Sequence, residues 1–424
     1  MRAQDYPLKY SLQQCLDFAV NNSYAAHRAS LDISEAAYQL KEAVAGVLPQ
    51  ISGSSSYDNN VVLPTMMMPG EIIGEPGTQI PVQIGTKHTL DFSAVAEQVI
   101  FAPSLFTGIK IARNNSELQT LRATMTKEEI VFDVSHVFYD ILNSMQELDN
   151  INYMITKQDS LSLLMKKRVE ENITREVDLN RVKVNLTNMY ARSEHIKNTI
   201  SQQKRYLQIL IGMPVGYRLE LDDSEAKNIE PIGLQTELSL HNKVEIDILN
   251  KQKDILGLDI RLSKMGYLPT LSAFASAGYQ FQSDRLNLAK DPWFNTVIVG
   301  VRLSVPIFDG FGKHNRIKQK QSQLQRLEWD ITETQQHVFA SYQDAKERLQ
   351  VIYSLVQAQS ENLQLAEKVY TQTMALYTEG LASITDLLET ETSLREAKIA
   401  YTTEVIRYRK TEIDLSKASG TLLN

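Results

Sequence analysis

The segment LPTLSAFASAGYQF, residues 268–281, has a counterpart 220 positions earlier in LPQISGSSSY, residues 48–57. The match continues upstream and downstream of both segments. The paired positions are Asn22 with Asn242, residues 118–121 (LQTL) with 324–327 (LQRL), Asp178 with Asp386, Leu186 with Leu394, Leu207 with Leu415, and Gly212 with Gly420. The chain is therefore a tandem duplication of a unit of roughly 200 residues, and duplicated folds usually have their function at the axis or seam between the copies.

Residues 270–281 alternate between apolar and polar side chains, and residues 296–307 alternate in the same phase. The first copy repeats the pattern more weakly at 90–97, and its serine-rich segment 50–57 predicts another strand. Alternation over about 10 to 12 residues is longer than the usual strand and fits a membrane strand with one face toward lipid and one toward water. An ordinary half-buried antiparallel sheet would show the same alternation, so this pattern alone leaves both interpretations open.

Two further features favour the membrane interpretation. The segment 62–77 between the first two long strands is rich in proline and glycine and is predicted to be an unstructured loop. Trp293 and Phe294 stand at the start of a strand, where aromatic residues of a membrane interface are expected. Four strands cannot close a barrel, and an open sheet edge in lipid leaves backbone groups without hydrogen bonds. A membrane sheet in this protein therefore requires several chains.

The helical segments carry apolar residues at alternating spacings of four and three. In the second copy this seam runs from Val338 to Tyr370 and is broken only at Gln359, and in the first copy it runs from Val134 to Ile155 with Asn152 in the one polar position. Such spacing is typical of coiled coils. The first long helix is predicted from about residue 104 to 166, on the order of 90 Å at 1.5 Å per residue, and it is too polar to cross a bilayer.

Composition excludes several classes of protein. The formal charge is −7 and no basic block is present, which argues against nucleic-acid binding. The single cysteine, Cys15, excludes an intrachain disulfide, and its helical surroundings predict a buried side chain. No phosphate loop, nucleophile elbow or paired-histidine metal motif is present, so we expect no enzyme, no cofactor and no metal.

Met1 and the residues after it lack the pattern of a signal peptide. Met1 is interpreted as the product of a start codon added in front of a processed chain.

This order of elements resembles the TolC-type outer-membrane efflux proteins. The resemblance rests on the duplication and on two motifs, VPIFDG at 305–310 and GLASITDLLE at 380–389. It implies a mainly α fold with a membrane β-barrel part: long coiled-coil hairpins and four strands per chain, assembled as a homotrimer with a 12-stranded barrel and a 12-helix periplasmic tunnel. The first repeat, residues 1–215, would hold a helix, strands at about 50–60 and 88–101 and a hairpin at 104–212. The second repeat, 216–424, would hold a helix, strands at about 270–282 and 294–307 and a hairpin at 312–420.

The resemblance also implies a function. The expected protein is the passive exit channel of a tripartite efflux system for small molecules, in the outer membrane of a Gram-negative bacterium and extending into the periplasm. Its expected partners are outer-membrane lipid, a periplasmic adaptor and an inner-membrane transporter of the RND or ABC type. A channel for type I protein secretion stays open as an alternative. A soluble periplasmic coiled-coil scaffold or adaptor is a further alternative from a different class.

In the resembled family, acidic residues just beyond the hairpin turns constrict the tunnel. The matching positions are Asp386 and Glu389, while Tyr377 falls on the gating tyrosine and Asp178 on its partner aspartate. Ala382 replaces the arginine that normally ties the closed state, and Arg175 is a candidate substitute. Ser383 and Asp386 also have the spacing of a helix capping box, so a purely structural role for Asp386 stays open.

The family's adaptor contacts fall at the two hairpin turns. The docking candidates are Asn172, Ile173 and Thr174 in the first turn and Gly380, Leu381, Ala382 and Ser383 in the second. Gly380 suits a left-handed turn position, and Asn172, at the equivalent place, is an accepted substitute for glycine there.

Overall fold

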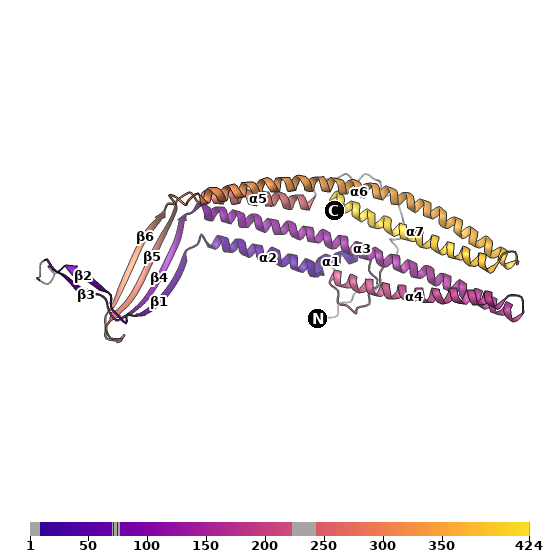
Figure 1. Cartoon of the computed structure of the whole chain (residues 1–424), viewed down its shortest axis with the longest axis horizontal. Coiled ribbons are helices and arrows are strands. Elements are labelled where there is room, and N and C mark those ends of the chain that lie inside the picture. Colours follow the sequence, from indigo (N-terminus) through magenta and orange to yellow (C-terminus); the bar gives the residue numbers. More distant parts are fainter. Residues whose placement is uncertain (1–8, 70, 72–73, 75–76, 223–242, 424) are drawn as a thin grey trace. The chain divides into compact units, whose positions relative to one another are not determined.

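The computed structural model describes residues 9–69, 71, 74, 77–222 and 243–423. Met1, Asn242, Gly70 and Pro76, which entered the sequence analysis, lie outside the described residues. The fold is mainly helical with a small sheet, as predicted (Figure 1). The elements in order are α1 (Leu12–Asn22), α2 (Tyr24–Ala45), β1 (Gln50–Asn59), β2 (Thr65–Pro69), β3 (Gln79–Gln83), β4 (His88–Phe101), α3 (Pro103–Glu170), α4 (Glu176–Ile211), α5 (Val244–Met265), β5 (Thr270–Ser283), β6 (Trp293–Ser304), α6 (Gly312–Thr378) and α7 (Ile384–Ser419).

The chain forms two compact units. The helical unit comprises Met1–Ser34, Leu118–Lys251 and Leu327–Asn424, and the sheet unit comprises Glu35–Glu117 and Gln252–Arg326. Both repeats contribute to both units. The duplication therefore does not divide the chain into two separate domains, since each compact unit combines equivalent parts of the two copies.

The main sheet of the sheet unit has four antiparallel strands in the order β1-β4-β5-β6. Strand β4 of the first repeat pairs with β5 of the second, so the two repeats join at the middle of the sheet (Figure 1). Strands β1 and β6 are the two outer strands. Each of them presents one side of its backbone without a partner strand in this sheet.

A second, two-stranded sheet corrects the prediction of an unstructured loop at 62–77. Strands β2 and β3 pair in an antiparallel ribbon in which Met66 lies opposite Val82 and Met68 opposite Ile80. These cross-strand apolar pairs stabilise the ribbon. Each strand of a two-stranded ribbon has a free edge, so the ribbon tolerates Pro69, one of the prolines that signalled a loop, and Pro81 of β3.

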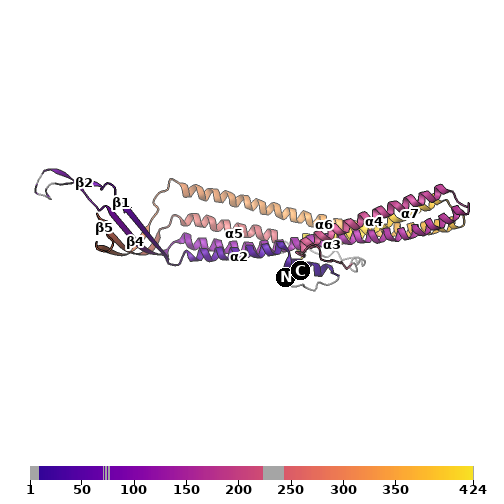
Figure 2. The ribbon, with the colours of Figure 1, turned by 90° about the horizontal axis from the view of Figure 1, so that it is seen from below.

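Two antiparallel helix pairs, α3 with α4 and α6 with α7, supply most of the helical unit (Figures 1 and 2), and the first turns of α3 and α6 belong to the sheet unit. The predicted coiled-coil seam of α6 is confirmed, because Val338, Tyr342, Ala345, Leu349, Ile352 and Val356 are all buried. In α3, Val134, Phe138, Ile141 and Ile155 belong to the largest core cluster. Helix α3 has 68 residues, somewhat more than the sequence predicted.

Equivalent helix ends in the two repeats have the same backbone geometry. Asn172 and Gly380 end the long helices at φ 62° and 77°, and Gly212 and Gly420 end α4 and α7 at φ 79°. At the first turn, Ile173 N donates to Arg168 O at 2.8 Å, and at the second, Leu381 N donates to Leu376 O at 2.8 Å. This is the Schellman pattern. The left-handed turn positions predicted for Asn172 and Gly380 are confirmed.

Candidate functional site

One face of the main sheet is apolar and exposed. Its rows of paired residues include Gly53–Ala94–Ala277–Val297 and Ile51–Ala96–Ala275–Val299. Val299 is 79% exposed and Val297 72%. An ordinary half-buried sheet would pack this face against a core, whereas here the apolar side chains point outward. Contiguous exposed apolar surface of this kind marks a protein or membrane contact.

Aromatic side chains gather at one end of this apolar face. Trp293 stacks on Tyr279 at a centroid distance of 4.8 Å and lies 6.1 Å from Phe92 and 5.4 Å from Phe281. The indole Nε1 of Trp293 donates to Leu288 O at 3.1 Å. An aromatic band beside an apolar band is typical of membrane strands at the water interface. The aromatic band is therefore where a lipid-facing sheet would meet the headgroups.

The opposite face of the sheet is largely polar. Its rows include Ser54–Ser93–Gly278–Thr296 and Ser56–Asp91–Gln280–Phe294. Ser54 Oγ and Ser93 Oγ are hydrogen-bonded at 2.8 Å. The alternation in the sequence thus separates into one exposed apolar face and one hydrophilic face that suits contact with water.

Near the two hairpin turns of the helical unit, an apolar cluster joins the hairpins. Met165 and Leu179 of the first hairpin pack in this cluster with Tyr377 and Leu387 of the second. The phenolic OH of Tyr377 donates to Met165 Sδ at 2.7 Å. Burial raises the pKa of Tyr377 above its usual value, so the phenol is neutral at physiological pH. The predicted gating tyrosine therefore lies inside the contact between the hairpins.

Two arginines that the sequence analysis missed lie in this contact. The guanidinium of Arg168 lies 5.6 Å from the ring centroid of Tyr377, a cation–π distance. Arg181 donates to Thr385 Oγ1 of the other hairpin at 3.2 Å. Arg181 lies three residues after Asp178 on one face of α4, a spacing that was available in the sequence. Arg168 gave no comparable signal, because its partner Tyr377 is 209 residues away.

Asp178 is only 5% exposed and is surrounded by arginines. Arg175 Nε lies 3.2 Å from its Oδ2, and Arg181 NH1 lies 3.6 Å from its Oδ1. Arg175, the candidate lock, thus contacts the aspartate of its own hairpin, and its side chain is largely exposed. The arginine over the ring of Tyr377 is Arg168.

Asp386 and Glu389 are exposed near the start of α7. Asp386 Oδ2 accepts from Ser383 N at 3.0 Å, and Ser383 Oγ accepts from Asp386 N at 3.1 Å, which confirms the capping box. The hydrogen bonds from Ser383 lower the pKa of Asp386, so its carboxylate is charged at neutral pH. Asp386 therefore caps a helix while it presents a negative charge to solvent.

The docking candidates occupy the two turns. Ile173 is 65% exposed and Leu381 is 76% exposed. Asn172, Gly380 and Ser383 are also exposed, whereas Thr174 is half-buried. Ala382 packs against the apolar cluster between the hairpins. Each turn thus presents one large apolar side chain to solvent.

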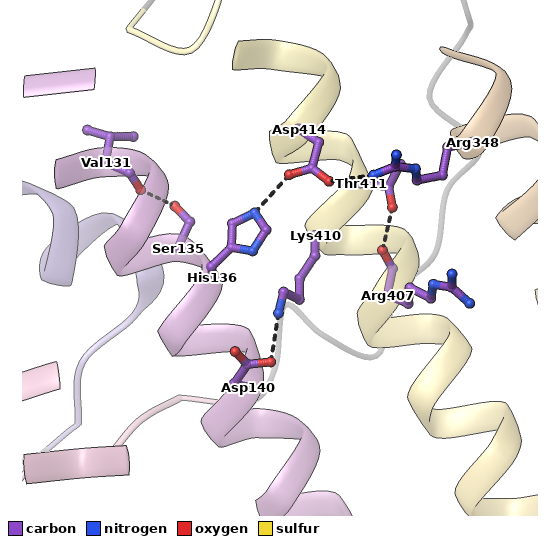
Figure 3. A network of polar contacts seen from close by, with 9 residues as sticks. All are labelled: Val131, Ser135, His136, Asp140, Arg348, Arg407, Lys410, Thr411 and Asp414. Carbon is purple, nitrogen blue, oxygen red and sulfur yellow. Dashed lines mark hydrogen bonds and ion pairs between the residues drawn. The ribbon is translucent and has the colours of Figure 1, made fainter. Parts of the chain in front are cut away.

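A polar network further along the helical unit connects three helices (Figure 3). His136 of α3 bonds Asp414 of α7 at 2.9 Å, and Lys410 of α7 donates to Asp140 of α3 at 2.8 Å. Arg348 of α6 lies 4.0 Å from the same Asp414. These contacts hold α7 against α3. They are partly exposed ion pairs, which generally contribute little to stability one by one.

In the part of the chain that the structure describes, no group of three or more His, Cys, Asp or Glu side chains is arranged to hold a metal ion. No helix among the described residues has the length and apolar character needed to cross a membrane. Cys15 is buried, and its burial raises the pKa of the thiol to about 12.

Residues 254–421 match the sequence model of the outer membrane efflux protein family. No curated protein sequence matches the chain. Solved structures match along nearly its full length. VceC of Vibrio cholerae, an outer membrane protein, has a TM-score of 0.74 at 15% identity and covers 96% of each chain. The CmeC outer membrane channel of Campylobacter jejuni has a TM-score of 0.78 at 16% identity over 97% of this chain and 85% of that one. The open state of the MtrE outer membrane channel of Neisseria gonorrhoeae has a TM-score of 0.73 at 13% identity over 97% and 89%.

These likenesses show that the whole chain has the same fold as these solved outer membrane proteins. The match to the outer membrane efflux protein family is confined to residues 254–421, which lie in the predicted second repeat. The resemblance drawn from the sequence is thereby confirmed.

Proposed function

We propose that this protein is the outer-membrane channel of a tripartite efflux system, a passive exit duct for small molecules. The exposed apolar face of the main sheet, with its aromatic band, is the observation that carries the proposal. Buried in lipid, that face would be shielded from water, while the polar face would line a pore. A soluble scaffold or adaptor would have no use for this surface.

The proposed assembly is a homotrimer. In a membrane, the outer strands β1 and β6 need partners, because backbone groups without hydrogen bonds cost several kcal/mol each in lipid. Pairing β6 of one copy with β1 of the next satisfies both edges. Three copies then give a closed 12-stranded barrel, and their long helices form a 12-helix tunnel in the periplasm.

The partners follow from this assignment. A periplasmic adaptor would dock at the turns 172–174 and 380–383, and an inner-membrane transporter of the RND or ABC type would drive transport. The exposed side chains of Ile173 and Leu381 support this docking site, since an exposed apolar side chain at each turn suits a packed contact with a partner. The constriction would lie at Asp386 and Glu389, with Asp178, Tyr377 and Arg175 near the gate.

The mass of the detergent-solubilised protein tests the assembly. Native mass spectrometry should find a complex of three 48.0 kDa chains. The protein should also fractionate with the outer membrane when it is expressed behind an export signal. A monomer in mild detergent that remains in the soluble periplasmic fraction would contradict the proposal.

A further inference from the structure

A carboxylate is buried in the contact between the two hairpins. Glu391 of α7 is 2% exposed. It follows the buried Leu387 by four residues and precedes the buried Leu394 by three, so it occupies a seam position of the coiled coil. Such positions normally take apolar residues. Burying an ionisable side chain there is costly unless the side chain is neutral or has hydrogen-bond partners.

Its hydrogen-bond partners come from the other hairpin. The side-chain amide of Gln158 of α3 is oriented with its nitrogen toward Glu391 of α7. This nitrogen donates to Glu391 Oε2 at 2.9 Å and to Oε1 at 3.3 Å. The amide oxygen of Gln158 accepts from Asn185 Nδ2 of α4 at 3.2 Å. Gln158 is 1% exposed. Gln158, Asn185 and Glu391 thus connect α3 and α4 with α7, and we call these three residues the inter-hairpin polar layer.

Few charges act on this carboxylate. Arg395, one turn further along α7, favours the ionised form, but burial outweighs it and raises the pKa of Glu391 to about 7. Tyr370 of α6 is half-buried nearby, and its own pKa is raised by burial and by Glu391. Two turns beyond Glu391 on α7, Lys398 lies 3.6 Å from Glu367 of α6 and 4.8 Å from the ring centroid of Tyr153 of α3.

We propose that the inter-hairpin polar layer is a proton-dependent latch, in which neutral Glu391 keeps the two hairpins packed and ionised Glu391 favours their separation. Separation lets water reach the carboxylate, which a packed seam excludes. The latch itself depends only on the contacts within the helical unit. Its consequence for transport, opening of the tunnel, rests on the proposed function.

The direction of the pH effect follows from linkage. If the carboxyl returns to its ordinary pKa of 4.5 when the hairpins separate, the packed state binds the proton more tightly than the separated state does. The packed state is then most stable below pH 4.5 and loses stability as the pH rises to about 7. Within this window the ratio of separated to packed protein rises up to about tenfold per pH unit, and above it the ratio is constant.

Hydrogen exchange of the full chain in detergent, measured by mass spectrometry, tests the latch. Peptides from 154–165 of α3 and 387–394 of α7 would be followed from pH 5 to pH 8 and corrected for the pH dependence of chemical exchange. In the wild type, their protection should fall about 40-fold from pH 5 to pH 7 and only about twofold more at higher pH. Glu391→Gln, which keeps the shape without the charge, should remove this dependence.

Two further variants keep the test independent of folding defects in a single mutant. Glu391→Leu should also give protection that does not change with pH, whereas Glu396→Gln, at an exposed position of the same helix, should behave like the wild type. Equal pH responses in the wild type and Glu391→Gln, or no response in the wild type, would overturn the latch. Single-channel recordings of the same proteins test the channel separately. A protein without conductance would contradict the proposed function, whereas the latch is tested by the hydrogen-exchange result alone.

Discussion

At the scale of single residues, the contact between the hairpins depends on a few polar side chains among apolar ones. Arg168 covers the ring of Tyr377, Arg181 reaches Thr385, and Ser383 shares its hydrogen bonds with Asp386. Asp386 is exposed and charged, so the carboxylate that accepts the capping hydrogen bond from Ser383 is also the group proposed for the constriction.

Ser383→Ala should fray the first turn of α7. Loss of an N-cap hydroxyl costs about 1 kcal/mol of helix stability, because one backbone N–H loses its acceptor. The change should appear as faster hydrogen exchange at residues 384–388. Ser393→Ala is the matched control, since that exposed hydroxyl only donates to Glu389 O inside the helix. Equal exchange in both variants would contradict the capping role.

Arg168→Ala should loosen the contact between the hairpins. A cation–π contact contributes about 0.5–1 kcal/mol at a partly exposed site, so the separated state should increase about two- to fivefold. In the proposed channel, this change should increase the fraction of time that the channel is open. Lys167→Ala removes the same charge from an exposed neighbour and should leave the open fraction unchanged. A similar increase in both variants would assign the effect to charge alone.

At the scale of elements, the main sheet separates an exposed apolar face from a polar face. Adjacent residues of one strand therefore differ sharply in what they tolerate. Ala277 lies on the apolar face between Ala94 and Val297, and Ser276 lies on the other face between Val95 and Ile298.

Ala277→Arg should impair membrane insertion, whereas Ser276→Arg should be tolerated. An arginine on the lipid face near the middle of a bilayer costs about 2–4 kcal/mol, while a residue toward a water-filled pore costs little. The yield of folded trimer in the outer membrane measures the difference. Equal yields for both variants, or the reverse order, would contradict the assignment of the faces.

The sequence predicted these elements where their pattern is local. Alternation at 271–281 predicted β5, the seam from Val338 predicted the core of α6, and the Ser383–Asp386 spacing predicted the cap. The prolines and glycines of 62–77 misled the prediction for β2, because proline is excluded from central strands but is tolerated in a strand with a free edge. The contacts Arg168–Tyr377 and Gln158–Glu391 join residues more than 200 positions apart, so no local pattern could have indicated them.

At the scale of the whole molecule, the duplicated chain supplies equivalent elements to each compact unit. The chain has the fold of outer-membrane channels, and its sheet has two outer strands and an apolar face that is exposed in a single copy. In the proposed trimer, closure by three copies would pair the free edges and place the apolar face against lipid.

The central claim is that three copies form a pore constricted by the carboxylates near the second turn. Rings of carboxylates favour cations and restrict a narrow passage. The hydrogen bonds from Ser383 lower the pKa of Asp386 below its ordinary value of 3.8, so its charge should persist across the physiological range.

Single-channel conductance of the purified protein in a planar bilayer tests this claim most directly. The wild type should show a small, cation-selective conductance, and the double variant Asp386→Ala, Glu389→Ala should show a larger and less selective one. Ser383→Ala, which removes the cap and keeps both carboxylates, should retain the selectivity of the wild type. Failure of every protein to insert, together with a monomeric mass in mild detergent, would contradict the account.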